Sequence, residues 1–197
     1  MKIVPTLAIC ALVLSSTFAA TASAQSHSPN PVANAKKMLS PGTEAKDFQL
    51  RAIAGELSGE VQLSQVNAEG PVVVVVLRGF PGRQCPACSA QVGDIVKNAN
   101  KFAAKNARVL LIYPGAKLQL GQHANDFLQG TKLPKPLTFM LDPDFQFTNA
   151  YGLRWNATNE TAYPTTLVVD KSGKITYVKI SETHGGRAMS NEILAAL

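Results

Sequence analysis

Two cysteines stand three positions apart in the stretch RQCPAC, residues 83–88. A cysteine pair at this spacing can close a disulfide and reopen it, which is redox chemistry. The nucleophile in such chemistry is the thiolate, and the N-terminus of a helix favours it because backbone N–H groups there are unpaired. The spacing therefore marks Cys85 and Cys88 as candidate catalytic residues and as a candidate redox-active disulfide.

Two other uses of a cysteine pair fit this sequence less well. A zinc site needs two further ligands, yet the remaining candidates are Cys10 and three histidines, at positions 27, 123 and 184, none of them at ligand spacing. An inert structural disulfide would stabilise little, because so short a loop closes almost no chain entropy. We therefore expect redox chemistry, with no metal and no other cofactor.

The segments on either side of the cysteines indicate how they are positioned. Val72–Leu77 is an unbroken apolar run rich in β-branched residues, typical of a strand buried on both faces. After the cysteines, apolar residues recur at helical spacing from Val92 to Phe102. Pro86 suits the first turn of a helix, where its missing N–H is not needed. We expect the cysteines at the junction between a buried central strand and a helix.

The rest of the chain alternates between strand and helix patterns. The expected elements are a hairpin at 48–63, a strand at 109–113, a helix at 121–129, a strand at 137–141, a hairpin at 165–178 and a helix at 191–197 capped by Ser190. This order predicts an α/β fold with a central mixed sheet and helices on both faces.

The N-terminus has the layout of a secretory signal. Lys2 is its positive end, residues 3–18 are mostly apolar, and Ala22-Ser23-Ala24 is a small-residue cleavage site. We expect cleavage before Gln25 and a periplasmic or secreted protein. Cys10 lies within the apolar run, with Ile9 before it where a lipidation site needs a small residue, so we assign it to the signal. The run is too short to span a membrane, and no other segment approaches the necessary length.

The chain therefore divides into a signal peptide (1–24), a flexible leader (25–38) and one domain (39–197). The leader is rich in Ser, Asn, Pro and Ala and shows little periodicity. The formal net charge is +6, but the basic residues are spread thinly and form no stripe interleaved with aromatics. Nucleic-acid binding is therefore not expected.

Further motifs occur in order along the predicted domain. Gly42, followed by Ala45-Lys46-Asp47-Phe48, is similar to G-x-x-A-P-D-F, with lysine in place of proline. Arg78-Gly79 ahead of the cysteines is similar to R-G-x-W-C-P-x-C, with two extra residues and Gln84 in place of tryptophan. Residues 170–175 match D-x-x-G-x-I, and Arg187 with residues 192–194 forms a tail motif. Together these motifs resemble the peroxiredoxin-like (AhpC/TSA, redoxin) branch of the thioredoxin-like superfamily, over about residues 39–197.

The resemblance implies a thioredoxin-like fold and a thiol oxidoreductase that reduces hydroperoxides through a Cys85/Cys88 dithiol–disulfide cycle. In that cycle a thiolate becomes a sulfenic acid, the other cysteine condenses with it, and an external thiol or thioredoxin-like donor reopens the bridge. The alternative is a thioredoxin-type thiol–disulfide oxidoreductase that acts on protein disulfides through a mixed disulfide. A third reading is a redox-inactive binding module.

Two family patterns disagree about which cysteine attacks. The peroxiredoxin motif P-x-x-x-T/S-x-x-C, read from Pro81, makes Cys88 the attacking residue. The C-x-x-C pattern of thioredoxins makes Cys85 the nucleophile. We favour Cys85 as the more exposed sulfur and the one that reductants attack. It is expected at the helix N-terminus, whereas Cys88 lies one turn inside, where packing shields a thiol and raises its pKa.

A second departure concerns the substrate site. Peroxiredoxins have a peroxide-binding arginine just before the strand that ends in D-x-x-G, but here that place reads Tyr163-Pro164-Thr165. A proline followed by threonine resembles the cis-proline loop of thioredoxin-fold oxidoreductases, which lies against the disulfide. We therefore expect a cis Tyr163–Pro164 bond and assign Pro164 and Thr165 to substrate binding. The alternative is a trans proline that opens a strand.

Three arginines are candidates to replace the missing one. They are Arg78, Arg83 and Arg154, of which Arg78 is assigned to substrate binding, with lining the end of the strand as its alternative role.

Overall fold

The computed structural model describes residues 1–2 and 31–197. The expected signal peptide, its cleavage site and Cys10 lie outside these residues. Within the described part of the chain, no helix is long and apolar enough to cross a membrane.

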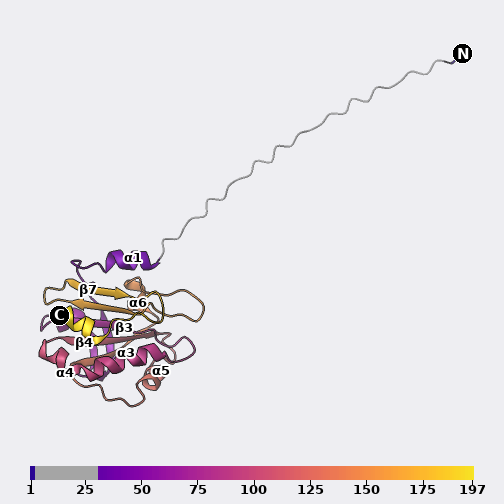
Figure 1. Ribbon diagram of the computed structural model, residues 1–197. Helices are drawn as coiled ribbons and strands as arrows, with labels where there is room; N and C mark the ends of the chain where they lie inside the picture. The colour runs from indigo at the N-terminus through magenta and orange to yellow at the C-terminus, as the bar shows by residue number, and fades with distance from the viewer. Residues whose placement is uncertain (3–30) are drawn as a thin grey trace.

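A seven-stranded mixed sheet forms the centre of the domain, in the order β2-β1-β5-β4-β3-β6-β7 (Figure 1). The strands are β1 (Gln49–Gly55), β2 (Gly59–Gln62), β3 (Val72–Val76), β4 (Arg108–Gly115), β5 (Leu137–Pro143), β6 (Thr165–Val169) and β7 (Ile175–Ile180). The pairs β3–β4 and β4–β5 are parallel, and the other neighbours are antiparallel. The predicted mixed sheet and N-terminal hairpin are confirmed.

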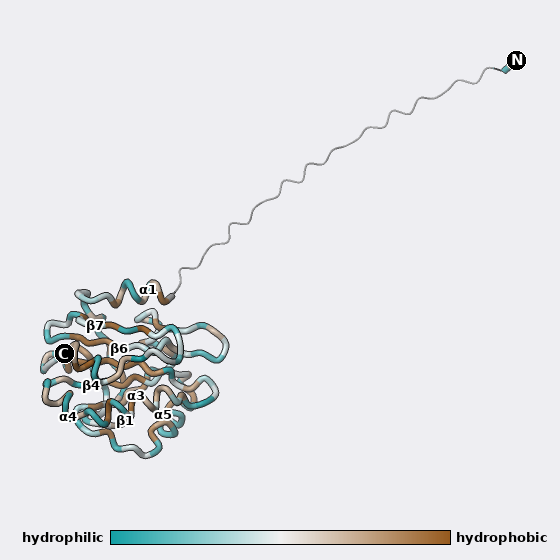
Figure 2. The backbone as a smooth tube through the Cα atoms, viewed as in Figure 1, coloured by the Kyte–Doolittle hydropathy of each residue, from teal (hydrophilic) through white to brown (hydrophobic). Residues whose placement is uncertain are grey.

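Helices cover both faces of this sheet. They are α1 (Pro31–Met38), α2 (Leu63–Asn67), α3 (Pro86–Lys97), α4 (Ala99–Ala104), α5 (Leu120–Leu128), α6 (Gln146–Ala150) and α7 (Ser190–Ala195). Alternate residues of a strand point to opposite faces, so Val72, Val74 and Val76 pack with α1, α2 and α6. Val73, Val75 and Leu77 pack with α3, α4, α5 and α7. The hydrophobic stretches lie mainly in the interior of the domain (Figure 2).

Helix α1 is a correction to the sequence analysis, which placed residues 31–38 in a flexible leader. Val32 and Ala35 share one face of this short helix with Leu39, the residue that directly follows it, and all three are at most 3% exposed. The isolated segment is too short to be a stable helix, and tertiary packing of its apolar face provides the stability. Its pattern was overlooked because three apolar residues give a weak periodic signal.

The last helix also differs in detail from the prediction. It begins at Ser190, with Met189 as the residue before it, and ends at Ala195. The Ser190 N–H donates to Asp94 Oδ2 on α3 at 2.7 Å. The Asp94 carboxylate, distant in sequence, therefore accepts an N–H at the start of α7, a role that was expected for the Ser190 side chain.

The topology brings three segments together at one end of the neighbouring strands β3, β6 and β7. Val76, at the end of β3, pairs with Thr165, at the start of β6, and Thr165 pairs with Ile180, at the end of β7. The chain that leaves β3, the chain that enters β6 and the chain that leaves β7 therefore lie side by side. Residues 78–85, 154–164 and 181–189 meet there.

Candidate active site

The loop from β3 to α3 is anchored to the elements beside it. Gly79 has a φ of +74°, and a Cβ there would lie 2.0 Å from the Pro114 carbonyl oxygen, so a larger residue does not fit. The Tyr113 hydroxyl donates to Gln84 Oε1 at 2.9 Å, and Gln84 Nε2 donates to the His123 carbonyl at 2.8 Å. These contacts tie the residue before Cys85 to β4 and α5.

Cys85 is the N-cap residue of α3. Its backbone is extended, with φ −93° and ψ 108°, and Pro86 follows in the first turn. Cys85 Sγ accepts a hydrogen bond from the Cys88 N–H at 3.2 Å. The sulfur thus occupies the place that a serine or aspartate oxygen often takes. A thiolate accepts such a bond better than a thiol and is favoured by the positive end of the helix dipole.

Both cysteines are free thiols and both are buried. Cys85 is 3% exposed and Cys88 is 1% exposed, so the expected difference in exposure exists but is small. Cys88 Sγ accepts from the Arg78 backbone N–H at 3.4 Å. Each sulfur therefore accepts a backbone N–H, Cys85 from Cys88 and Cys88 from Arg78.

The pKa values of the two thiols are shifted in opposite directions. The hydrogen bond from the Cys88 thiol lowers the pKa of Cys85 to about 5 although burial opposes it, and the Cys88 N–H, Arg187 and Arg78 lower it further. The same hydrogen bond, together with burial, raises the pKa of Cys88. At neutral pH, Cys85 is the thiolate and Cys88 keeps its proton.

Arg187 is the arginine that reaches the thiolate. Its Nη2 lies 3.5 Å from Cys85 Sγ. Its Nε donates to the His184 carbonyl at 3.1 Å, and its Nη1 donates to Gln91 Oε1 at 3.2 Å. Gln91, on α3, also donates to the Ala188 carbonyl at 3.0 Å, which fastens this segment to the active-site helix. Sequence analysis noted Arg187 only within a tail motif and did not assign it to the site.

The three candidate arginines have other partners. The Arg78 guanidinium pairs with Glu160 at 2.7 Å, so Arg78 contacts a cysteine through its backbone and not its side chain. Arg154 lies 4.1 Å from the centre of the Phe145 ring and donates to backbone carbonyls. Arg83 is exposed. Among the hydrogen bonds of the described residues, none joins these three guanidinium groups to either sulfur.

The predicted cis bond before Pro164 is wrong. Lys135–Pro136 is the cis peptide bond of the described residues, and Tyr163–Pro164 is trans. Trans is the ordinary preference of such bonds, and here the buried proline leads into β6 with its carbonyl accepting from the Ser181 N–H at 2.8 Å. The Thr165 hydroxyl donates to the Tyr163 carbonyl at 2.9 Å. Substrate contacts by Pro164 and Thr165 stay a prediction.

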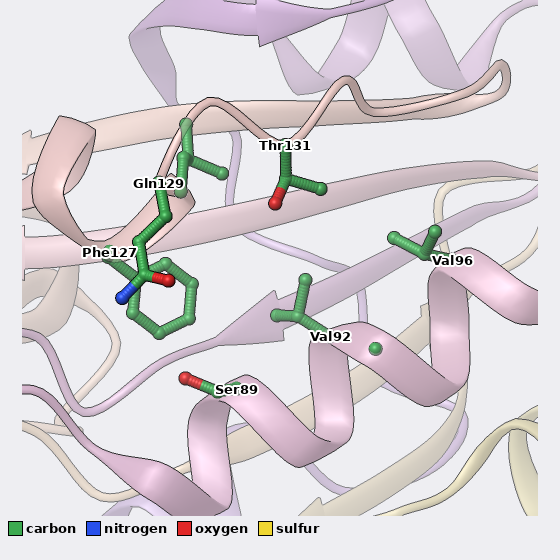
Figure 3. Close-up of a pocket in the computed structure, with 8 residues that line it drawn as sticks. Ser89, Val92, Val96, Phe127, Gln129 and Thr131 are labelled. Atoms are coloured by element: carbon green, nitrogen blue, oxygen red, sulfur yellow. The ribbon is translucent and has the colours of Figure 1, made fainter.

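A pocket of about 210 Å³ lies beside α3, beyond the cysteines (Figure 3). Its lining consists of Ser89, Val92, Gly93, Val96, Phe127, Leu128, Gln129 and Thr131. The side chains from α3 face those from the end of α5 and the following loop. Ser89 links the pocket to the site, because its hydroxyl donates to the Cys85 carbonyl at 3.4 Å. Neither cysteine is among the residues that line the pocket.

Fold and dithiol together define the class: the protein is a thiol-dependent oxidoreductase with a thioredoxin-like fold. The described residues contain no cluster of histidine, cysteine and carboxylate side chains that could hold a metal ion. The Redoxin family model matches residues 40–197. The chain therefore belongs to the Redoxin family.

Solved structures of peroxiredoxins have a similar fold. Yeast mitochondrial 1-Cys peroxiredoxin matches with a TM-score of 0.64 and 13% identity, over 80% of this chain and 74% of that one. AhpC of Mycobacterium bovis matches with a TM-score of 0.63 and 20% identity, over 80% and 89%. Reduced 2-Cys peroxiredoxin of Plasmodium vivax matches with a TM-score of 0.62 and 18% identity, over 79% and 92%. No curated protein sequence matches the chain.

The low pKa of Cys85 predicts an unusual pH dependence for its alkylation. A thiol with a pKa of about 5 is already ionised at neutral pH, so the iodoacetamide rate should be flat between about pH 6.5 and 8. As the pH falls through 5 the thiolate is protonated, and the rate should fall about tenfold per pH unit. Absorbance at 240 nm follows the same ionisation. A rate that keeps rising through pH 8, as it does for free cysteine, would contradict this.

Proposed function

We propose that the protein is a thiol peroxidase that reduces hydroperoxides through a Cys85/Cys88 dithiol–disulfide cycle. The observation that carries this proposal is the thiolate of Cys85 with the Arg187 guanidinium 3.5 Å from its sulfur. A guanidinium stabilises the thiolate and also offers several N–H donors to the oxygens of a bound peroxide. Membership of the Redoxin family supports a peroxidase-type reaction.

In the first step, the Cys85 thiolate attacks one oxygen of the hydroperoxide. The S–O bond forms as the O–O bond breaks, so the sulfur is oxidised by two electrons and the peroxide is reduced. The leaving oxygen takes a proton and departs as water or an alcohol, while the other oxygen remains on Cys85 as a sulfenic acid. Arg187 stabilises the negative charge that develops on the leaving oxygen.

In the second step, the Cys88 sulfur attacks the sulfenic acid of Cys85. The S–S bond forms, the S–O bond breaks, and the hydroxyl leaves as water with the proton from Cys88. Because the Cys88 N–H already donates to Cys85 Sγ at 3.2 Å, the two residues are adjacent before the disulfide forms. An external thiol or thioredoxin-like donor then reduces the disulfide by thiol–disulfide exchange.

A second candidate function is thiol–disulfide exchange with protein substrates. The observation that favours it is Cys85 at the N-cap, ionised and followed three residues later by a protonated cysteine. This arrangement also serves attack on a disulfide, with a mixed disulfide at Cys85 that Cys88 resolves.

The two functions separate when the reduced protein meets each oxidant in turn. We expect hydrogen peroxide or cumene hydroperoxide to oxidise the protein about a hundredfold faster than free cysteine thiolate, since oriented donors contribute about this much. Stopped-flow fluorescence measures these rates, with scrambled ribonuclease as the disulfide substrate. A fast reaction with the disulfide alone would favour the second function. Slow reactions with both the hydroperoxides and the disulfide substrate would favour the redox-inactive binding module.

We also propose that the protein is exported and loses residues 1–24. When the full-length chain is expressed in a secreting host, mass spectrometry of the exported protein should find Gln25 at the N-terminus. The matched control replaces Ala22 and Ala24 by leucine, which removes the small residues that signal peptidase requires. An intact Met1, or a lipid on Cys10, would overturn the proposal.

A further inference from the structure

The carboxylate of Glu160 joins two of the segments that meet at the dithiol. It lies in the loop before β6, and its side chain is 11% exposed. Its Oε2 accepts from Arg78 Nε at 2.7 Å, and its Oε1 lies 2.8 Å from His184 Nε2. Burial would raise the pKa of Glu160, but the hydrogen bonds from Arg78 and His184 hold that pKa below its usual value. The group is therefore an anion shared between two partners.

The two partners of Glu160 lead to different cysteines. Arg78 contacts Cys88 directly, and His184 contacts Arg187, which reaches Cys85. The Arg78 side chain is 5% exposed, and the backbone N–H of the same residue donates to Cys88 Sγ at 3.4 Å. The His184 carbonyl accepts from Arg187 Nε at 3.1 Å, and Arg187 Nη2 lies 3.5 Å from Cys85 Sγ. Glu160 itself hydrogen-bonds neither sulfur.

We propose that Glu160 is a positioning residue that holds the chain leaving β7 against the end of β3, so that Arg187 stays beside the Cys85 thiolate. The inference rests on the proposed role of Cys85 as the reactive thiolate. Without this carboxylate, His184 loses its link to Arg78 at the end of the central strand. Gln91 on α3 still contacts Arg187 and the Ala188 carbonyl. The His184 end of the segment is no longer held, however, so the guanidinium shifts away from the sulfur. Cys85 then loses the positive charge of Arg187, the guanidinium that lies beside its sulfur.

The sign of the change in pKa distinguishes positioning from simple charge removal. Removing a negative charge near a thiol favours the thiolate, so a through-space effect of Glu160→Gln would lower the pKa of Cys85. Loss of the nearby Arg187 cation does the opposite. The positioning role therefore predicts a higher pKa for Cys85 in Glu160→Gln, by about one, which is typical of losing an opposite charge.

The test measures the ionisation of the reduced protein by absorbance at 240 nm between about pH 3 and 9. Of the two cysteines that the structure describes, only Cys85 titrates in this range, because the pKa of Cys88 is raised; the protein titrated is the form beginning at Gln25, which lacks Cys10. Glu182→Gln is the matched control, because it also removes one negative charge and Glu182 lies in the same segment as His184. Glu182 is exposed and pairs with Lys36 instead. We expect the pKa of Cys85 to rise in Glu160→Gln and to stay unchanged in Glu182→Gln. No rise, or a fall, in Glu160→Gln would overturn the proposal.

A double variant tests whether Glu160 acts through Arg187. In Arg187→Met the pKa of Cys85 is already raised, so adding Glu160→Gln should raise it no further if both substitutions remove the same interaction. An additional rise of equal size would overturn the coupling. If Glu160→Gln does not fold, as judged by circular dichroism, His184→Ala is compared in the wild-type and Arg187→Met backgrounds. The proposal then requires a rise in the first background and none in the second. The titration needs no peroxide, so its outcome is independent of the proposed peroxidase activity.

Discussion

Cys85→Ser is expected to abolish peroxide consumption, whereas Cys88→Ser should preserve the first reaction and stop after one turnover. The pKa of Cys85 is about 5 and that of Cys88 is raised, so we expect Cys85 to be the attacking thiolate at neutral pH. A serine at position 85 has no ionised sulfur. A serine at position 88 can still donate a hydrogen bond to Cys85 but cannot form the disulfide. Cys88→Ser should therefore accumulate a sulfenic acid on Cys85.

The measurement is labelling with a dimedone-type probe, followed by mass spectrometry of the peptide that contains both positions. The expected adduct lies on Cys85 in Cys88→Ser, and Cys85→Ser shows none above the unreacted protein. The opposite pattern, with the adduct on Cys88 in Cys85→Ser and none in Cys88→Ser, would show that the peroxiredoxin spacing identifies the attacking residue. Thermal unfolding of both reduced variants controls for misfolding.

This uncertainty between the two cysteines shows where sequence reasoning ends. The spacing from Pro81 to Cys88 fits one family pattern and the spacing from Cys85 to Cys88 fits another, so motif counting alone does not choose. The helix-terminus argument favoured Cys85 from local physics, and the structure places this residue at the N-cap, as that argument requires. Local placement was predictable because a buried strand, a proline and an apolar helical stripe adjoin one another in sequence.

The fold was predictable for a similar reason. A run such as Val72–Val76 has the composition of a strand covered on both faces, and the hairpins have turn residues between apolar runs. Helix α1 was missed because its stability comes from packing against the rest of the domain rather than from its own sequence. The trans Tyr163–Pro164 bond shows the complementary error, in which a family likeness was given more weight than the ordinary preference of the peptide bond.

The electrostatic part of the site was not predictable from spacing. Arg187 follows Cys85 by 102 positions, and Glu160 lies between them in a loop with no motif for redox chemistry. Their meeting depends on the strand order β3-β6-β7, which places the end of β7 and the end of β3 on either side of the start of β6. Three candidate arginines were named because they are near motifs, but proximity in sequence does not determine which guanidinium reaches the sulfur.

Arg187→Met is expected to slow the reaction with peroxide by about a hundredfold at pH 7.5 while leaving iodoacetamide alkylation nearly unchanged. Methionine keeps an apolar stem but removes the charge. Loss of the cation raises the pKa of Cys85 by about one, and a thiol that starts at about 5 is then still ionised at pH 7.5. Alkylation needs only the thiolate, so its rate in Arg187→Met should stay close to that of the wild type. The reaction with peroxide also develops charge on the leaving oxygen, which Arg187 stabilises, so its rate should fall.

Parallel stopped-flow and alkylation measurements on the same reduced samples decide the point. Arg83→Met is the matched control, since Arg83 is an exposed arginine close to Cys85 in sequence and should behave as wild type in both reactions. Arg187→Lys should recover only part of the peroxide rate, because an ammonium keeps the charge but lacks the planar fork of donors that binds two oxygens at once. If the two rates fall together in Arg187→Met, Arg187 acts only by ionising the thiol. Equal peroxide rates in Arg187→Met and wild type would remove Arg187 from the mechanism.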